Sequence, residues 1–276
     1  SSSHFGSRLQ RFCCAGLSDF AFSSSTMLAD GTNPEGVDPS PPLEWNNKED
    51  IKDVSLYGMQ PSPPCTKIRY HLAYSGIPFK CIKGKKKGSS YTKVPVMVAG
   101  GKQCNDSYVI CKNIIPALYG ADAYNEEWEC SKITYGAQLA MECEVLEDPG
   151  SVRSILSMMG MPSCLASCCC CLLPIGGRSK KFPSKIRKQR AEHDSKYGPL
   201  RDFASYLAEF AAVVKSKGGF FEGAEYPGPV DISMYATVQP WAEHIPYVAM
   251  GITAAGLDTW VESVRQKMPA DIPKFS

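Results

Sequence analysis

Short apolar runs divided by turn-forming residues fill the first half of the chain. Residues 53–58 alternate between polar and apolar side chains, which predicts a β-strand, and residues 65–75 carry apolar side chains at helical spacing. Two further strands are predicted at 78–82 and 94–98, because both segments are short and apolar. A second helix is expected after 105–107, where Asn, Asp and Ser provide a cap before an apolar run. This order of elements indicates a small α/β domain.

The second half of the chain is predicted to be mainly helical from Glu126 onward. Its apolar side chains recur at spacings of three and four, as expected of helices that bury one face. The sequence Gly-Pro-Val-Asp at 228–231 is typical of a helix start, because proline suits the first helical position. A last helix is predicted over 257–268, before Pro269.

These patterns divide the chain into three parts. We expect an extended arm or linker at 1–50, since 27–50 is rich in turn-forming residues, then a first domain at 51–122 and a helical domain at 123–276. The first 26 residues are rich in Ser and resemble part of an organelle-targeting segment. They predict either an arm that docks on a partner or a disordered tail.

One segment of the helical half has a different character. Residues 154–177 carry no charged side chain, and residues 178–190 are rich in Lys and Arg without any acid. The apolar segment is long enough to cross a bilayer, although its Pro, Gly and Ser residues weaken a lipid-facing helix. Three interpretations stay open: a buried helix, a segment that docks on a membrane surface or a complex, and a true span. The basic residues suit an anionic lipid surface or the acidic face of a partner.

The composition indicates which binding partners and which cellular compartment to expect. A formal net charge of +2 gives no general attraction to nucleic acid, and the basic segments lack interleaved aromatic residues, so no nucleic-acid partner is expected. The 13 cysteines include contiguous runs at 13–14 and 168–171, which do not resemble a disulfide framework and indicate a reducing compartment. The 4 histidines are scattered singly, so no metal site is expected.

The candidate functional residues lie in three motifs. These are Ser62-Pro63-Pro64-Cys65 between a strand and a helix, Val94-Pro95 at a strand start, and Asp106-Ser107 at a helix start. Together they resemble the glutathione-binding half of the glutathione-transferase and glutaredoxin superfamily. The segments 89–98 and 104–110 resemble, more narrowly, the membrane-associated prostaglandin E synthase 2 family.

The resemblance covers roughly residues 53–268. It implies a fold of the α+β or α/β class, with a thioredoxin-like N-terminal domain followed by an all-helical glutathione-transferase-type domain. It also implies that Pro95 is cis, so that the main chain of Val94 can pair with glutathione. Asp106 and Ser107 would then hold the γ-glutamyl carboxylate at a helix N-terminus. Ordinary helix capping and a structural proline are the alternative reading of the same residues.

The expected reactive turn departs from these relatives. Their turn has the form Cys-Pro-x-Cys and its first cysteine reacts, whereas Ser62 stands at that position here. A serine needs a neighbouring base to act as a nucleophile, and the turn holds none. Ser62 could instead stabilise the thiolate of bound glutathione by a hydrogen bond. Cys65 remains as a candidate thiol for redox chemistry, at a position one helical turn inward where burial is expected.

Two functions are predicted from these features. The first is a catalytically degenerate glutathione-transferase-like protein that serves as an accessory, structural or assembly subunit of an organelle membrane complex. The alternative is a glutathione-dependent isomerase or transferase that acts on a hydrophobic, lipid-derived substrate. In either case we expect a membrane-associated protein of the mitochondrion or plastid, in contact with complex partners or an anionic membrane through 1–50, 83–87 and 154–190.

Overall fold

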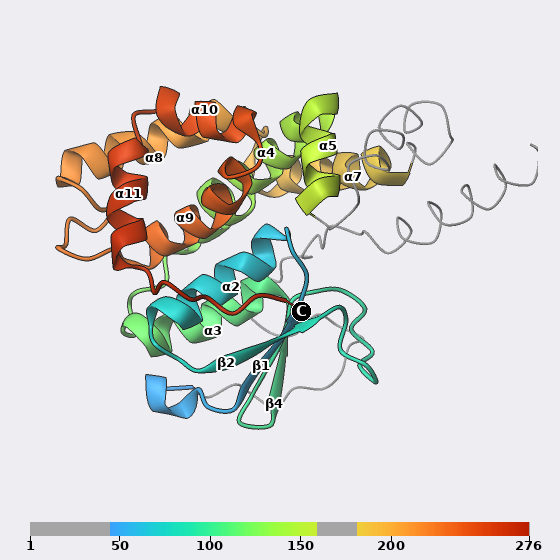
Figure 1. Ribbon diagram of the computed structural model, residues 1–276, viewed down its shortest axis with the longest axis vertical. Helices are drawn as coiled ribbons and strands as arrows, with labels where there is room; N and C mark the ends of the chain where they lie inside the picture. The colour runs from blue at the N-terminus through green and yellow to red at the C-terminus, as the bar shows by residue number, and fades with distance from the viewer. Residues whose placement is uncertain (1–44, 159–180, 276) are drawn as a thin grey trace, which may run out of the picture.

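The computed structural model describes residues 45–158 and 181–275 of the chain. These residues form a sheet domain and a helical domain that lie against each other (Figure 1). Helices α2 (Pro63–Tyr74) and α3 (Ser107–Tyr119) lie between the sheet and the helical domain. The fold class predicted from the sequence is confirmed, with a thioredoxin-like domain first and a helical domain second.

The described part of the first domain is built on a four-stranded mixed sheet. The strands are β1 (Val54–Gly58), β2 (Phe79–Lys83), β3 (Val96–Ala99) and β4 (Lys102–Asn105), and a short 3-10 helix, η1 (Lys48–Asp50), precedes them. The spatial order is β2-β1-β3-β4, in which β1 runs parallel to β2 and antiparallel to β3, and β3 runs antiparallel to β4. The end of β1 therefore lies beside the start of β3.

The third strand begins later than predicted. The strand expected at 94–98 begins only at Val96, after the cis peptide bond between Val94 and Pro95. Proline has no N–H group to donate to a neighbouring strand, so regular pairing starts after it. The main chain of Val94 is thereby left outside the sheet.

The core of the first domain lies between the sheet and its two helices. Leu56 of β1, Ile68 and Leu72 of α2, and Ile110 of α3 are fully buried members of one apolar cluster. The spacing of four between Ile68 and Leu72 places both on the face of α2 that meets the sheet. Trp45 belongs to the same cluster, so the core draws on a residue of the predicted arm.

The second domain is a bundle of helices. Its described elements are the π-helix η2 (Glu127–Thr134) and the α-helices α4 (Gly136–Glu147), α5 (Pro149–Met158), α7 (Lys181–Tyr197), α8 (Phe203–Lys217), α9 (Pro229–Ala242), α10 (Pro246–Ala254) and α11 (Asp258–Lys267). Helix α9 is buried along nearly its whole length and packs against α2 of the first domain. The indole nitrogen of Trp241 in α9 donates a 2.9 Å hydrogen bond to the carbonyl of Pro61, so the helical domain supports the turn between β1 and α2.

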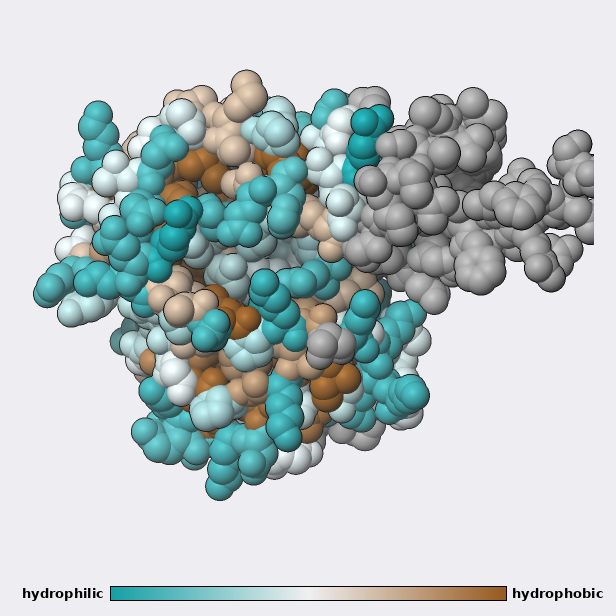
Figure 2. Space-filling view, viewed as in Figure 1, coloured by the Kyte–Doolittle hydropathy of each residue, from teal (hydrophilic) through white to brown (hydrophobic). Residues whose placement is uncertain are grey.

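The apolar segment predicted at 154–177 lies mostly outside the described residues. Only 154–158 is described, as the end of α5, and Ile155 there is buried in the helical core. Across residues 45–158 and 181–275, no helix is both long enough and apolar enough to cross a membrane. Figure 2 shows apolar colour at the surface over α10, where Tyr247 and Met250 are exposed.

Candidate functional site

The turn between β1 and α2 presents Ser62 as the N-cap residue of α2. Its carbonyl accepts hydrogen bonds from the amide of Thr66 at 3.0 Å and from the Thr66 hydroxyl at 3.1 Å. Its own hydroxyl does not cap the helix, is buried, and makes no hydrogen bond within the described chain. A buried hydroxyl without a partner carries an unmet desolvation cost, which a ligand could remove.

Cys65 lies one turn further along α2 and points into the core of the first domain. Its side chain is fully buried, in line with the sequence prediction. Burial raises the pKa of the Cys65 thiol to about 11, against the opposite influence of Ser62, Met59 and Arg69. The thiolate is the reactive form of cysteine, so burial and the raised pKa both act against reaction at Cys65.

Val94 and Pro95 stand at the start of β3, next to the end of β1. Val94 is buried, and its main-chain groups make no backbone hydrogen bond to any described residue. The carbonyl of Pro95 accepts a hydrogen bond from the amide of Asp106 at 3.3 Å. This contact joins the second and third sequence motifs.

Asp106 and Ser107 begin helix α3. One carboxylate oxygen of Asp106 caps the helix by accepting from the Tyr108 amide at 2.9 Å, and the other accepts from the Tyr91 hydroxyl at 3.2 Å. Burial raises the pKa of Asp106 to about 6, although the Tyr108 amide acts in the opposite direction. The Ser107 hydroxyl is fully buried and, like that of Ser62, has no hydrogen-bond partner in the described chain.

The fold therefore brings five of the six candidate residues to one end of the sheet. Ser62 follows β1, Val94 and Pro95 precede β3, and Asp106 and Ser107 follow β4. The Cys65 side chain is buried in the core behind the turn, with its sulfur beside Gly58 at the end of β1. The two unpartnered hydroxyls lie at helix N-termini, which favour anionic groups through their unpaired amides and dipole. The arrangement is suited to binding a small acidic peptide and contains no described group suited to nucleophilic attack.

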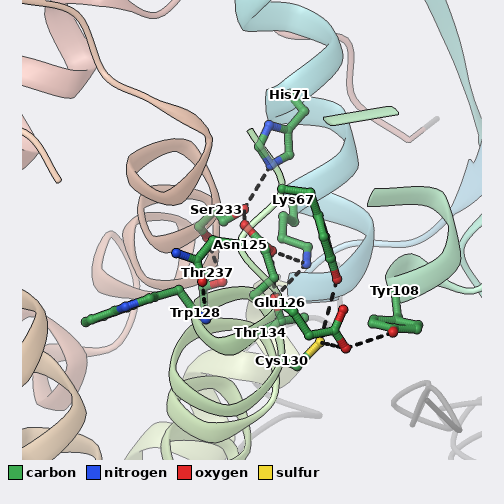
Figure 3. A network of polar contacts seen from close by, with 12 residues as sticks. Lys67, His71, Tyr108, Asn125, Glu126, Trp128, Cys130, Thr134, Ser233 and Thr237 are labelled. Atoms are coloured by element: carbon green, nitrogen blue, oxygen red, sulfur yellow. Dashed lines mark hydrogen bonds and ion pairs between the residues drawn. The ribbon is translucent and has the colours of Figure 1, made fainter. Parts of the chain in front are cut away.

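A second polar site lies between the two domains and was not predicted from the sequence (Figure 3). Lys67 of α2 donates to Glu129 at 2.9 Å and to the hydroxyl of Thr134 at 2.6 Å. Ser233 of α9 donates to the other oxygen of Glu129. These side chains are all buried, so the ion pair is shielded from water on every side.

Burial and neighbouring groups shift the pKa values of Lys67 and Glu129 in opposite directions. Burial lowers the pKa of Lys67, but neighbouring Cys111 and Glu129 outweigh it and hold the pKa above its usual value. Burial likewise raises the pKa of Glu129, while Lys67 and His71 bring it below the usual value. Both members of the pair are therefore ionised at neutral pH.

His71 extends the network from the same face of α2, four residues after Lys67. Its Nε2 lies 2.9 Å from the Ser233 hydroxyl and its Nδ1 lies 2.9 Å from the Tyr119 hydroxyl. Burial lowers the pKa of His71 to about 4, so the ring is neutral. Because Ser233 gives its proton to Glu129, Nε2–H donates to Ser233 and Nδ1 accepts from Tyr119. Lys67 and His71 are four residues apart and therefore share one face of α2, which was the sequence signal for this site.

A cleft of about 380 Å³ lies away from the candidate residues, beside the end of α3 and the start of α9. Its lining consists of Tyr119, Asp122, Ala123, Asn125, Phe221, Glu222, Gly228 and Pro229. None of the six predicted site residues contributes to it. In the described ranges, no group of three or more His, Cys, Asp or Glu side chains is placed to hold a metal ion.

Comparison with known proteins bears on the sheet domain. Residues 56–120 match the family model of the glutathione S-transferase N-terminal domain. The match contains the turn at Ser62, the cis proline at 95 and the helix start at Asp106. This part of the chain, which has a thioredoxin-like sheet, is thus similar to the N-terminal domain of glutathione S-transferases.

Solved structures with a similar chain trace are also glutathione-transferase-like. A glutathione S-transferase of Ceriporiopsis subvermispora in complex with glutathione has 16% sequence identity and a TM-score of 0.45, with 79% of this chain and 99% of that chain covered. A GST-like protein of Pseudomonas syringae has 14% identity and a TM-score of 0.44, with 82% and 70% covered. A possible glutathione S-transferase of Rhodopseudomonas palustris has 17% identity and a TM-score of 0.43, with 82% and 93% covered. No curated protein matches the sequence.

Proposed function

We propose that this protein is a catalytically degenerate glutathione-transferase-like protein that serves as an accessory or assembly subunit of an organelle membrane complex. The observation that carries the proposal is the chemistry of the first turn. Ser62 stands where the resemblance places the reactive cysteine and is 3% exposed, and Cys65 is 0% exposed with a raised pKa. A serine without a neighbouring base and a protonated, buried thiol do not supply a nucleophile.

The burial of the surrounding residues supports the same proposal. Val94, Tyr91, Asp106 and Ser107 are each less than a tenth exposed. A transferase needs an open cleft in which a thiol and a second substrate meet. The residues around the turn are buried, and this burial favours a structural role for this end of the sheet.

Assays of thiol conjugation test this proposal. We expect no detectable conjugation of glutathione to an aromatic electrophile, and no isomerisation of a lipid endoperoxide, above the uncatalysed rate. Ser62→Ala is compared with Ser55→Ala, which changes a half-buried serine of β1 outside the turn. A measurable rate that falls at least about tenfold in Ser62→Ala but not in Ser55→Ala would show active chemistry at the turn and reject the proposal.

Glutathione binding is a second candidate function, and a specific observation favours it. The Ser62 and Ser107 hydroxyls are buried without partners at the starts of two helices, and the main chain of Val94 is unpaired among the described residues. These donors and acceptors match the carboxylate and the extended main chain of a tripeptide. Binding of this kind is compatible with the loss of catalysis.

Calorimetry with glutathione tests the binding candidate. We expect a dissociation constant in the millimolar range or tighter and a loss of binding by about tenfold or more in Ser107→Ala. Ser205→Ala, at a half-buried serine near the start of α8, is the matched control and should bind as the unchanged protein does. Absence of heat at millimolar glutathione would reject binding at this site.

The membrane context of the proposal rests on the basic and apolar segments of the sequence. Of these, residues 83–87 lie in the described chain, where Lys83, Lys85 and Lys87 are exposed. Exposed lysines are attracted to anionic lipid or to acidic protein surfaces. Replacement of these three lysines by glutamine should weaken sedimentation with anionic vesicles or with the complex. Unchanged co-sedimentation of that variant would exclude this loop as a contact.

A further inference from the structure

The two faces of the sheet are covered differently. The face toward α2 and α3 carries Leu56, Met97 and Cys104, which are fully buried in the apolar core of the first domain (Figure 1). Side chains alternate between the two faces along a strand, so the sequence neighbours of these residues point to the opposite face. We refer to that opposite face as the outer face.

The outer face carries a row of apolar side chains across three strands. Tyr57 of β1 is in register with Ile82 of β2 and with Val96 of β3, so the three side chains lie next to one another. None of them belongs to an apolar cluster of the described chain. Val96 is fully buried, whereas Tyr57 and Ile82 are only half-buried.

The connection between β2 and β3 covers only one side of the outer face. Gln103 of β4 is in register with Val98 and therefore shares the outer face, and its Nε2 donates to Ser89 Oγ at 3.1 Å. Ser89 belongs to this connection, which consequently lies over the β4 side. The β1 and β2 side, with Tyr57 and Ile82, is left accessible to a further segment.

The accessible side is bordered by positive charge. Lys80 is in register with Ser55 and lies on the outer face, and Lys83, Lys85 and Lys87 follow it; all four lysines are exposed. Within residues 45–158 and 181–275, none of the four forms an ion pair with an acid. An occupant with both carboxylates and apolar side chains would match this surface.

Residues 27–44 have that composition, and we refer to them as the acidic segment. The segment contains Asp30, Glu35, Asp38 and Glu44 without any Lys or Arg, together with the apolar residues Met27, Leu28, Val37 and Leu43. Prolines at 34, 39, 41 and 42 favour an extended chain and remove N–H groups that strand pairing would need. The segment therefore suits the face of a sheet rather than its edge.

The point of attachment keeps the acidic segment close to the sheet. It joins the described chain at Trp45, which is 7% exposed and is fixed in the core of the first domain. A segment of this length can span about 60 Å when extended, whereas a four-stranded sheet is about 15 Å wide. A short covalent connection also gives a local concentration on the order of millimolar, so weak contacts are enough for docking.

We propose that the acidic segment docks on the outer face of the sheet in its own chain. Its apolar residues lie against Tyr57 and Ile82, and its carboxylates pair with Lys80, Lys85 and Lys87. An external acidic surface that uses the same lysines would have to displace the segment.

Carbodiimide cross-linking of the full chain tests this contact, because the reagent joins only carboxylates and lysines that touch. Equal amounts of unlabelled and ¹⁵N-labelled protein are mixed, so that mass spectrometry separates links within a chain from links between chains. We expect links within one chain from the acidic segment to Lys80, Lys85 or Lys87, at least about tenfold more frequent than links to Lys215 and Lys217. The latter two are exposed lysines of α8 in the helical domain. Links between chains would make a second copy the occupant, and equal frequencies would show no docking; either result overturns the proposal.

Cleavage after Glu35 by a glutamate-specific protease measures the docking independently, since the protease acts on the released segment. Lys85→Gln combined with Lys87→Gln should raise the cleavage rate about threefold or more, and so should Ile82→Thr, which keeps a β-branched side chain in the strand. Lys215→Gln combined with Lys217→Gln is the matched control and should leave the rate unchanged. Unchanged rates in the lysine variant of the connection, or an equal rise in the control, would contradict the proposal.

Discussion

Asp106 combines a helix cap, a buried charge and a left-handed backbone at one residue. Its φ angle is +76°, a region in which Asp and Asn are the most tolerated side chains after Gly. Its carboxylate accepts hydrogen bonds from the Tyr108 amide and from the Tyr91 hydroxyl. The sequence identified the cap but not the burial that shifts the pKa, because burial depends on what packs over the residue.

This shift predicts an unusual dependence of stability on pH. The pKa of Asp106 is about 6 in the folded protein and about 3.9 in an unfolded chain, so the folded state binds the extra proton between these values. Its contribution to stability is therefore full below about pH 4 and is lost as the pH rises through about 6. Urea unfolding from pH 4 to 7.5 should show that decline in the unchanged protein and a flatter profile in Asp106→Asn.

Asp202 provides the matched control for this experiment. It also caps a helix, α8, by accepting from the Ser205 amide, but it is exposed. The bonds from Ser205 lower the pKa of Asp202, so its contribution is present above the usual pKa and is lost as the pH falls. Asp202→Asn should thus change the profile only at acidic pH and with the opposite sign. The same profile in both variants would contradict the account of Asp106.

At the scale of elements, the junction between η2 and α4 depends on a glycine. A Cβ atom on Gly136 would lie 1.9 Å from the carbonyl oxygen of Ser131 and 2.7 Å from the Tyr206 ring. The π-helix brings that carbonyl closer to the next turn than an α-helix would. Glu129, which pairs with Lys67, lies in the same π-helix. Gly136 therefore helps to position the interdomain ion pair.

We expect Gly136→Ala to destabilise the protein by about 2 kcal/mol or more, because the added carbon meets backbone rather than a flexible side chain. Gly251→Ala in α10 is the matched control, since its Cβ would lie 3.4 Å from Leu207 and Phe203, which is ordinary contact. That change should stabilise the helix by roughly 0.5–1 kcal/mol. Chemical denaturation of both variants provides the comparison, and equal effects would refute the steric argument.

At the scale of the whole molecule, a buried ion pair joins the two domains. Lys67 comes from the sheet domain, and Glu129, Thr134 and Ser233 come from the helical domain. The pair forms only while the domains stay together, because separation of the domains would return both charges to water. The network thus contributes more to the relative orientation of the two domains than to the free energy of unfolding.

Removal of one partner should reveal this coupling. Lys67→Met leaves Glu129 buried without its counter-charge, and we expect a loss of about 3–5 kcal/mol in the free energy of unfolding. Lys188→Met breaks the exposed pair with Glu192, whose atoms are 3.8 Å apart, and should change stability by less than about 0.5 kcal/mol. Urea unfolding followed by tryptophan fluorescence measures both. A small effect of Lys67→Met would mean that water reaches Glu129.

The amino-acid sequence by itself determined the elements and the helix caps. Strand alternation, helical spacing and the cap at Asp106 are local, so the residues that decide them are neighbours in the chain. They placed β1, α2, β2 and α3 within a few residues of their observed bounds. The resemblance in the motifs then predicted which residues meet at the end of the sheet, and the fold brings five of the six together.

The tertiary structure alone decided which distant residues meet. Glu129 is 62 residues from Lys67, Ser233 is 162 from His71, and Pro273 is 204 from Arg69. Contacts at such separation depend on how whole elements pack, and hydrophobic periodicity states only which face of an element is buried. The burial of Ser62 and the contact between Arg69 and Pro273 follow from that packing, because burial is a property of everything that surrounds a residue.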